Sequence, residues 1–301
     1  MPQLLMKEPG AQGQFDEKIP VRIEPYKGSN PHVKEISSYL QSNLESDLIC
    51  ALVHLSLATG EEIPFSDFDG LLILKNEVFR DTVRLQHVAR MIRKSMKLIY
   101  EYDPFQHHGW FIMREEDLRM YPQTYFPDIF FSSSRIIFPD RAVELEIHSF
   151  PAEKTNYLSP FLSLSDEVIR KAEKGGQHYN RYILKGFLSQ VMLLPALYCQ
   201  AKYRRGILKK ESFTLARKDL SNDEWIVMDE VSQVRRSWQS TLTGRHRYMM
   251  TRINPLLARF RGKFAPATSK RITSFFSRDT YDRIIRLSGQ MKKKLDENKA
   301  D

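Results

Sequence analysis

Two segments of the first half show the three-to-four-residue apolar spacing of amphipathic helices. In the first, Pro31 stands where the opening turn of a helix tolerates proline. In the second, residues 81–100, Asp81 is a suitable N-terminal cap. We therefore predict a helix over each segment. The apolar positions are Val33, Ile36, Leu40 and Leu44 in the first, and Leu85, Val88, Ile92, Met96 and Ile99 in the second.

Shorter apolar runs around these helices predict strands. The clearest covers residues 142–147, where Val143, Leu145 and Ile147 alternate with acidic residues, as in a half-buried strand. Residues 1–30 are rich in glycine, proline and charge, which predicts an irregular arm. The other predicted apolar runs or strands cover residues 48–57, 68–74 and 110–114.

After about residue 155 the pattern predicts helices and no strands. A short helix over 166–174 ends at Gly175-Gly176. A long apolar helix over 179–203, which Pro195 should kink, carries Ile183, Phe187, Val191 and Leu194 on one face. A third helix covers 224–238. We therefore predict an α+β chain with a mixed α/β domain over 1–155, a helical domain over 156–238 and a basic helical tail over 239–301.

The positive charge is concentrated near the C-terminus. The chain has a net charge of +9, but residues 231–301 alone hold 17 Lys and Arg against 5 Asp and Glu, a net of +12. Aromatic residues interleaved with the basic ones over residues 235–299, such as Trp238, Tyr248 and Phe260, suit RNA or single-stranded nucleic acid by charge and stacking. The alternative is a helical extension that packs on the body, which Ile284 and Leu287 favour because they resemble a core-facing stripe.

Cysteine use and hydropathy indicate a soluble protein of a reducing compartment. Cys50 and Cys199 each lie in an apolar segment, which fits buried thiols better than a disulfide framework or a zinc site. We find no run of about 18 apolar residues and no apolar leader, so we expect neither a membrane span nor a membrane partner. We therefore expect a cytoplasmic location.

Asp67 and Asp69 are the strongest candidates for chemistry. Two carboxylates at i and i+2 on an extended segment point to the same side and can share a divalent ion. Mg²⁺ takes oxygen ligands from one or two carboxylates together with substrate phosphates. The alternative is a polar turn ahead of a strand, since Ser-Asp-x-Asp-Gly is ordinary turn chemistry. The surrounding segment favours the metal interpretation.

The segment from Ser56 to Asp69 resembles the nucleotidyltransferase superfamily of the DNA polymerase beta class. Small bacterial members often read Gly-Ser-x-Ala-x-Gly-Glu followed by Ser-Asp-x-Asp, and Ser56, Ala58, Gly60, Glu61, Ser66, Asp67 and Asp69 match this pattern. The resemblance implies a mixed sheet with flanking helices and with Asp67 and Asp69 as Mg²⁺ or Mn²⁺ ligands. It also implies that Ser56, Thr59, Gly60 and Ser66 lie near the phosphates of a nucleoside triphosphate.

Leu55 departs from this pattern, because the family has its first glycine at that position. Glycine lets backbone and phosphate approach without an intervening Cβ. A leucine at this point weakens the expectation of nucleotide binding and leaves two hypotheses open. The chain is either an active enzyme or an inactive module that binds nucleotide, RNA or a protein partner.

The resemblance also implies a third acid and a phosphate-binding lysine. Glu146 is the preferred third acid, Glu144 shares its strand face and Asp103 is a further candidate. The alternative for the glutamates is a solvent-facing edge strand. In the helical half, Lys209 or Lys210 follows a glycine turn where the family commonly places a lysine against the triphosphate. The alternative is a basic surface connection between two helices.

The adjacent pair His107 and His108 invites a metal hypothesis, but neighbours on an extended chain point apart and no cysteine completes a zinc set. We therefore expect a loop that packs one histidine and exposes the other. Similar Asp-Pro-x-Gln-His-His-Gly stretches occur in bacterial nucleotidyltransferase-like proteins. Taken together, the resemblance implies a metal-dependent enzyme that moves a nucleotidyl group from a nucleoside triphosphate to an acceptor hydroxyl. The acceptor, the base preference and the oligomeric state stay open.

Overall fold

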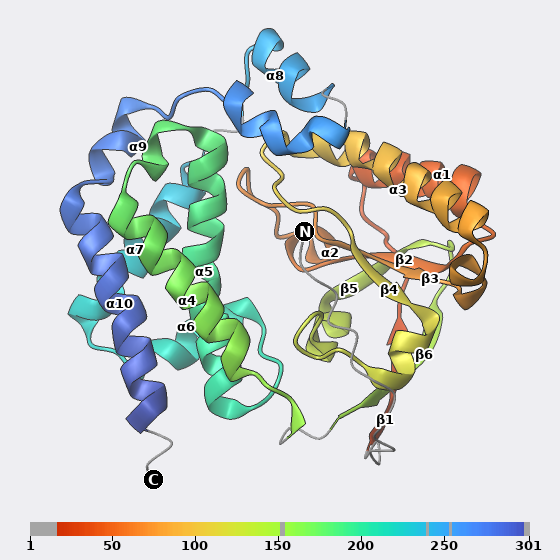
Figure 1. Cartoon of the computed structure of the whole chain (residues 1–301), viewed down its shortest axis with the longest axis horizontal. Helices are drawn as coiled ribbons and strands as arrows, with labels where there is room; N and C mark the ends of the chain where they lie inside the picture. Colours follow the sequence, from red (N-terminus) through yellow and green to blue (C-terminus); the bar gives the residue numbers. More distant parts are fainter. Residues whose placement is uncertain (1–16, 151–153, 239–240, 253–254, 298–301) are drawn as a thin grey trace.

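The structure is a computed structural model that describes residues 17–150, 154–238, 241–252 and 255–297 of the chain. An α/β half and a helical half lie side by side, and α8 lies across the top of the view in Figure 1. The predicted α+β class is confirmed, because a mixed four-stranded sheet is combined with helices.

Four strands form the central sheet in the order β4-β3-β2-β5. β3 and β4 are parallel, whereas β2 runs antiparallel to both β3 and β5. β1 and β6 pair separately as an antiparallel ribbon. The strands are β1 (Glu17–Ile23), β2 (Leu48–His54), β3 (Gly70–Leu74), β4 (Phe111–Arg114), β5 (Ser134–Phe138) and β6 (Val143–Ser149).

The helices begin where the sequence places their capping residues. Asn30 accepts a hydrogen bond from the backbone of α1, Pro31 occupies its first turn, and Asp81 caps α3 as predicted. The α-helices are α1 (Pro31–Leu44), α2 (Ser56–Thr59), α3 (Thr82–Tyr102), α4 (Leu158–Lys174), α5 (Arg181–Tyr203), α6 (Lys209–Arg217), α7 (Asn222–Arg236), α8 (Gly244–Thr251), α9 (Lys270–Phe275) and α10 (Arg278–Glu297). The 3-10 helices are η1 (Asn76–Arg80), η2 (Glu115–Met120), η3 (Asp128–Ser133), η5 (Gln177–Tyr179) and η6 (Pro255–Phe264).

Both faces of the central sheet are buried, which explains why β2 and β3 read as continuous apolar runs. Ala51 and Leu72 face α1 and α3 in one hydrophobic cluster. Cys50 and Leu71 point the other way, into a cluster with η3 and the β1-β6 ribbon. Both cysteines of the chain are free and buried, as the sequence analysis expected.

The helical half has its own core, and the basic tail contributes to it. Ile284 and Leu287 of α10 are fully buried in the same cluster as the inward face of α5. This confirms the expectation of a core-facing stripe in the tail. Phe65, from the loop that precedes Asp67, also enters this helical cluster. The loop with the acidic pair is therefore anchored in the second core.

Three details of the predicted elements were wrong. Residues 17–23 of the supposed irregular arm form β1, because their apolar side chains pair with β6 and cover the sheet; residues 1–16 lie outside the described part. The helix predicted over 166–174 begins earlier, at Leu158. Ile183 is 49% exposed, so the buried face of α5 is instead formed by Leu184, Phe187, Leu188 and Val191.

α5 is a core helix. Within the described residues it is the one helix whose length and composition would allow it to cross a membrane. However, 61% of its apolar window is buried inside the molecule. A buried helix of a soluble protein passes the same test, and the packing of α5 against α4, α6 and α7 accounts for its apolar character.

We predict that Ile284→Ala lowers the free energy of unfolding by about 2–5 kcal/mol, because a buried isoleucine leaves a cavity when it is truncated. Ile183→Ala on α5 is the matched control, since Ile183 is half exposed, and should cost less than about 1 kcal/mol. Urea denaturation of both variants measures the difference. Equal losses would show that the tail does not share the helical core.

Candidate functional site

The acidic pair lies on a short extended segment that bridges the two halves. Phe65 is buried in the helical core, and Phe68 is buried in the core between the sheet and α1. Asp67 and Asp69 flank Phe68 and are each partly exposed, with side-chain exposures of 16% and 22%. The i, i+2 spacing predicts that the two carboxylates share one side of the segment, and the charge of Asp67 acts on Asp69.

Gln106 holds the backbone between the two acids. Its Oε1 accepts a hydrogen bond from Phe68 N at 2.9 Å, and its Nε2 donates to Phe68 O at 3.0 Å. The carbonyl of Gln106 in turn accepts a hydrogen bond from Arg261 Nη1 at 2.8 Å. Arg261 also donates to Pro104 O and stacks over the ring of Tyr100, with its guanidinium carbon 3.5 Å from the ring centre. A tail arginine, 1% exposed, therefore fixes the loop that positions the pair.

Lys185 of α5 joins the acidic pair to a third carboxylate. Its ammonium lies 2.8 Å from Asp67 Oδ1 and 2.6 Å from Asp103 Oδ2, and the side chain has no solvent exposure. The other Asp103 oxygen accepts a hydrogen bond from Phe105 N at 3.0 Å. The contact with Asp67 lacks hydrogen-bond geometry, so Asp67 Oδ1 is buried without a hydrogen bond. The charge of this oxygen is met by its ion pair with the Lys185 ammonium.

Burial and the shared ammonium separate the acidities of the two aspartates. Burial works against the charged form of Asp67, but the Lys185 charge outweighs it and lowers the pKa of Asp67 to about 2. Burial, together with the Asp67 charge, raises the pKa of Asp103 to about 6. Burial also disfavours the ammonium, yet Asp103 and Asp67 raise the pKa of Lys185 above its usual value. Asp67 is therefore ionised at neutral pH.

Two histidines lie beside Asp69 in opposite environments. His108 Nε2 is 3.3 Å from Asp69 Oδ1; burial opposes its charge, but this contact raises the pKa of His108 to about 9. Burial lowers the pKa of His54 to about 4, because its ring lies among phenylalanines with Nδ1 unpartnered. His107 is exposed, so the expected split between a packed and an exposed histidine is confirmed.

Cations of the helical half lie near the acidic pair. Burial and the neighbouring Arg235 charge lower the pKa of Lys209 to about 7, while Asp67 and Asp69 oppose this effect. The guanidinium carbon of Arg235 lies 4.7 Å from the ring centre of Phe65, and its Nε is buried without a hydrogen bond. Of the two predicted lysines, Lys209 is thus the one that interacts electrostatically with both Asp67 and Asp69.

The turn after β2 begins with a backbone conformation that favours glycine. Leu55 has φ 57° and ψ −136°, in the left-handed half of conformational space that favours glycine. Gly60 ends α2 with φ 72°. Ser56 Oγ donates to Ser66 Oγ at 3.2 Å, so the two serines are in contact. The backbone at Leu55 is therefore glycine-like although the residue is not.

Glu146 and Lys210, both predicted as site residues, pair with residues other than Asp67 and Asp69. Glu146 is on the β1-β6 ribbon, 57% exposed, and pairs with Lys18 at 3.3 Å and His148 at 2.9 Å. Lys210 is exposed and pairs with Glu61 at 3.1 Å. The carboxylate that shares a counter-ion with the pair is instead Asp103.

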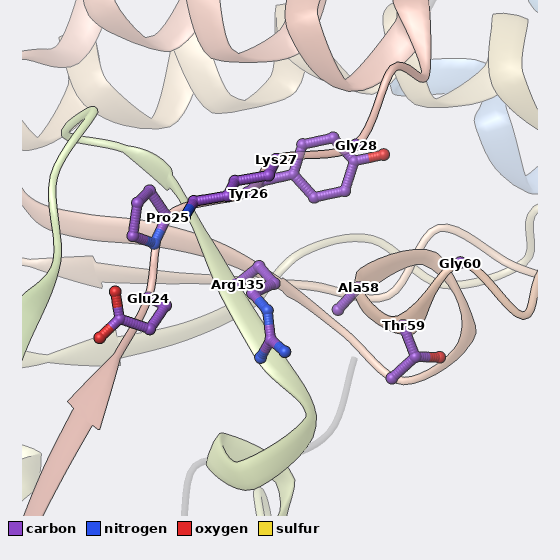
Figure 2. Close-up of a pocket in the computed structure, with 9 residues that line it drawn as sticks. All are labelled: Glu24, Pro25, Tyr26, Lys27, Gly28, Ala58, Thr59, Gly60 and Arg135. Carbon is purple, nitrogen blue, oxygen red and sulfur yellow. The ribbon is translucent and has the colours of Figure 1, made fainter.

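A cavity of about 540 Å³ lies on the outer side of α2 (Figure 2). In that view Arg135 lies between Glu24 and α2, and the ring of Tyr26 folds over Gly28. A Cβ at Gly28 would meet the Tyr26 hydroxyl at 2.2 Å, so glycine permits this approach. Two of the residues predicted to lie near phosphates, Thr59 and Gly60, line the cavity. The complete lining is Glu24, Pro25, Tyr26, Lys27, Gly28, Ala58, Thr59, Gly60 and Arg135.

The acidic pair fits one divalent ion only with help from a substrate. No three His, Cys, Asp or Glu side chains are grouped as a metal site anywhere in the described ranges. Mg²⁺ in phosphoryl-transfer sites commonly uses one or two carboxylates and completes its shell with water and phosphates. Asp67 and Asp69 meet that minimum, although Asp67 Oδ1 is buried against the Lys185 ammonium.

A comparison with protein-family models found no family that matches this chain, and a search of curated proteins found no relative. The geometry of the site therefore carries the functional argument.

Four residues that contact or support the acidic pair were not predicted as site residues: Lys185, Gln106, Arg235 and Arg261. The position of Lys185 in the sequence could have identified it. A lone lysine inside the buried stripe of an apolar helix needs a buried counter-ion. Arg261 had no such signal, because nothing in the sequence of the basic tail distinguishes this buried arginine from the others.

We predict that Leu55→Gly is more stable than Leu55→Ala by about 1 kcal/mol or more. Both variants remove the leucine side chain, but only glycine relieves the φ of 57°. At an ordinary position the order reverses, because glycine costs unfolded-state entropy. Thermal or urea unfolding of the two variants gives the sign, and a less stable glycine variant would contradict a strained backbone at this turn.

We predict that His54 makes the protein less stable as the pH falls from about 6.5 to about 4. The folded-state pKa of His54 is depressed, so the unfolded chain binds the proton first, and the loss reaches up to about 3 kcal/mol. The gap in unfolding free energy between the wild type and His54→Phe, measured across this range, isolates the effect from Asp103, whose raised pKa acts oppositely. A pH-independent gap would exclude a buried neutral imidazole.

Proposed function

We propose that the chain is a metal-dependent nucleotidyltransferase that moves a nucleotidyl group from a nucleoside triphosphate to an acceptor hydroxyl. The observation that carries the proposal is the meeting of Asp67 and Asp69 with cations from the helical half. A triphosphate with a bound divalent ion needs carboxylates for the ion and cations for its phosphates. Lys209 and Arg235 supply those cations beside the acidic pair.

The proposal gives roles to the acidic pair, to Gln106 and to the two cations of the helical half. Asp67 and Asp69 would hold Mg²⁺ or Mn²⁺, which when bound neutralises phosphate charge and polarises the phosphoryl group. Gln106 keeps the two carboxylates at a fixed spacing through both hydrogen bonds to Phe68. Lys209 and Arg235 orient the triphosphate. We assign no catalytic role to Glu146, because its partners are Lys18 and His148.

The glycine-like backbone at Leu55 supports the proposal independently of the acids. A leucine held at φ 57° costs on the order of 1–3 kcal/mol, which the surrounding fold must offset. We expect a protein to keep such a strained backbone where the shape of the turn is needed for function. The adjoining cavity, with Arg135 and Lys27 in its wall, offers space beside the turn for an anionic substrate.

The second candidate function is an inactive module of the same architecture that binds nucleotide, RNA or a protein partner. The Leu55 side chain favours it, because a Cβ at this turn limits the approach of a phosphate. RNA as acceptor or ligand is supported by α8, where Arg245, Arg247 and Tyr248 are exposed. Among the other tail aromatics, Phe276 and Tyr281 do not support stacking, since both are buried. The buried free thiols fit the proposed cytoplasmic location.

Calorimetry tests the proposal with ATP and GTP in the presence of Mg²⁺. We predict binding that requires the metal and weakens at least tenfold, about 1.4 kcal/mol, in the double variant Asp67→Asn with Asp69→Asn. Glu146→Gln is the matched control and should bind as the wild type does, because Glu146 is exposed on the other sheet. Metal-independent binding would favour the inactive module. An absence of binding in all three proteins would reject both nucleotide hypotheses.

A further inference from the structure

The contacts of Lys185 bear on how many metal ions the proposed site takes. Its ammonium lies between one member of the acidic pair and Asp103, within 2.8 Å of a carboxylate oxygen on each side. Two carboxylates that converge on one point are the usual setting for a shared metal ion. Here the point of convergence is occupied by a side chain of the same chain.

The ammonium is fixed by its surroundings. The Lys185 side chain has no solvent exposure, and its nitrogen lies 5.3 Å from the centre of the Phe65 ring. The residue extends from α5, whose neighbouring positions Leu184 and Leu188 are packed in the helical core. A charge buried to this depth cannot leave its partners without large cost, so the lysine is a permanent occupant of the position.

The local charges accommodate one divalent ion together with a triphosphate. Asp67, Asp69 and Asp103 carry three negative charges when ionised, and the Lys185 ammonium, the Arg235 guanidinium and the His108 imidazolium supply three positive ones. A divalent ion therefore needs further negative charge, which a bound triphosphate would supply. A second divalent ion would have to enter between Asp67 and Asp103, where an ammonium already stands.

We propose that the Lys185 ammonium permanently replaces the metal ion that Asp67 and Asp103 would otherwise share, so that the site takes a single divalent ion. This inference rests on the proposed function for the purpose of the remaining ion, but not for the lysine's occupancy. Asp67 then serves two cations, Lys185 and the divalent ion. Lys185 is a positioning residue, which fixes Asp67 through their ion pair and excludes the second metal.

Counting Mn²⁺ ions on the full-length protein without nucleotide tests this inference. Free Mn²⁺ is measured by electron paramagnetic resonance during titration of the wild type and of Lys185→Met, which removes the charge and keeps a similar length. We expect the wild type to bind no more than one ion at this site and Lys185→Met to bind one more. Lys185→Arg retains the charge and should gain none.

Two controls locate the extra ion. The gain should disappear when Lys185→Met is combined with Asp103→Asn, because one of the two converging carboxylates is then lost. Added Mn²⁺ should also raise the melting temperature of Lys185→Met more than that of the wild type, since binding to the folded state alone stabilises it. An equal ion count in the wild type and Lys185→Met would overturn the inference.

The test remains decisive if Lys185→Met does not fold. The wild type is then counted alone: one ion that depends on Asp67 would support the inference, whereas two such ions, or none, would contradict it. No nucleotide is used, so failure of this inference is distinct from failure of the proposed function. The latter is decided by metal-dependent binding of ATP or GTP.

Discussion

The buried ammonium of Lys185 is the interaction on which the site depends. It crosses from the helical half to the α/β half and contacts Asp67 and Asp103 within hydrogen-bonding distance. Removal of one member of such a buried set typically costs 3–5 kcal/mol, because the remaining charges lose their partner. The relative position of the two halves is therefore coupled to the ionisation of the acidic pair.

Aromatic anchors and hydrogen bonds reinforce that coupling. Phe65 and Phe68 insert into different cores from opposite ends of the same short segment. The Gln106 side chain forms hydrogen bonds with both the backbone N–H and the carbonyl of Phe68. Arg261, from the tail, donates a hydrogen bond to the carbonyl of Gln106. Asp67 and Asp69 thus sit on a segment with little freedom, as a preorganised site requires.

The arrangement favours binding of an anion that carries its own metal. The charges of Asp67 and Asp69 act on Lys209, and that of Asp67 acts on Arg235 and is already paired with Lys185. The Leu55 turn keeps a backbone that glycine would adopt more easily, and it adjoins a cavity with Arg135 in its wall. The Leu55 turn and the acidic pair lie at the same edge of the sheet, where β2 ends and β3 begins.

The sequence by itself determined the α+β class, most helices and strands, and the acidic pair, because these follow from local periodicity, capping residues and i, i+2 spacing. It placed Asp67 and Asp69 on one side of a segment, but it could not choose their neighbours. Only the tertiary structure brought in Lys185, selected Asp103 among the candidate third acids and located Glu146 on a separate ribbon. Contacts between residues so distant along the chain depend on how two cores pack, and no short-range pattern encodes that packing.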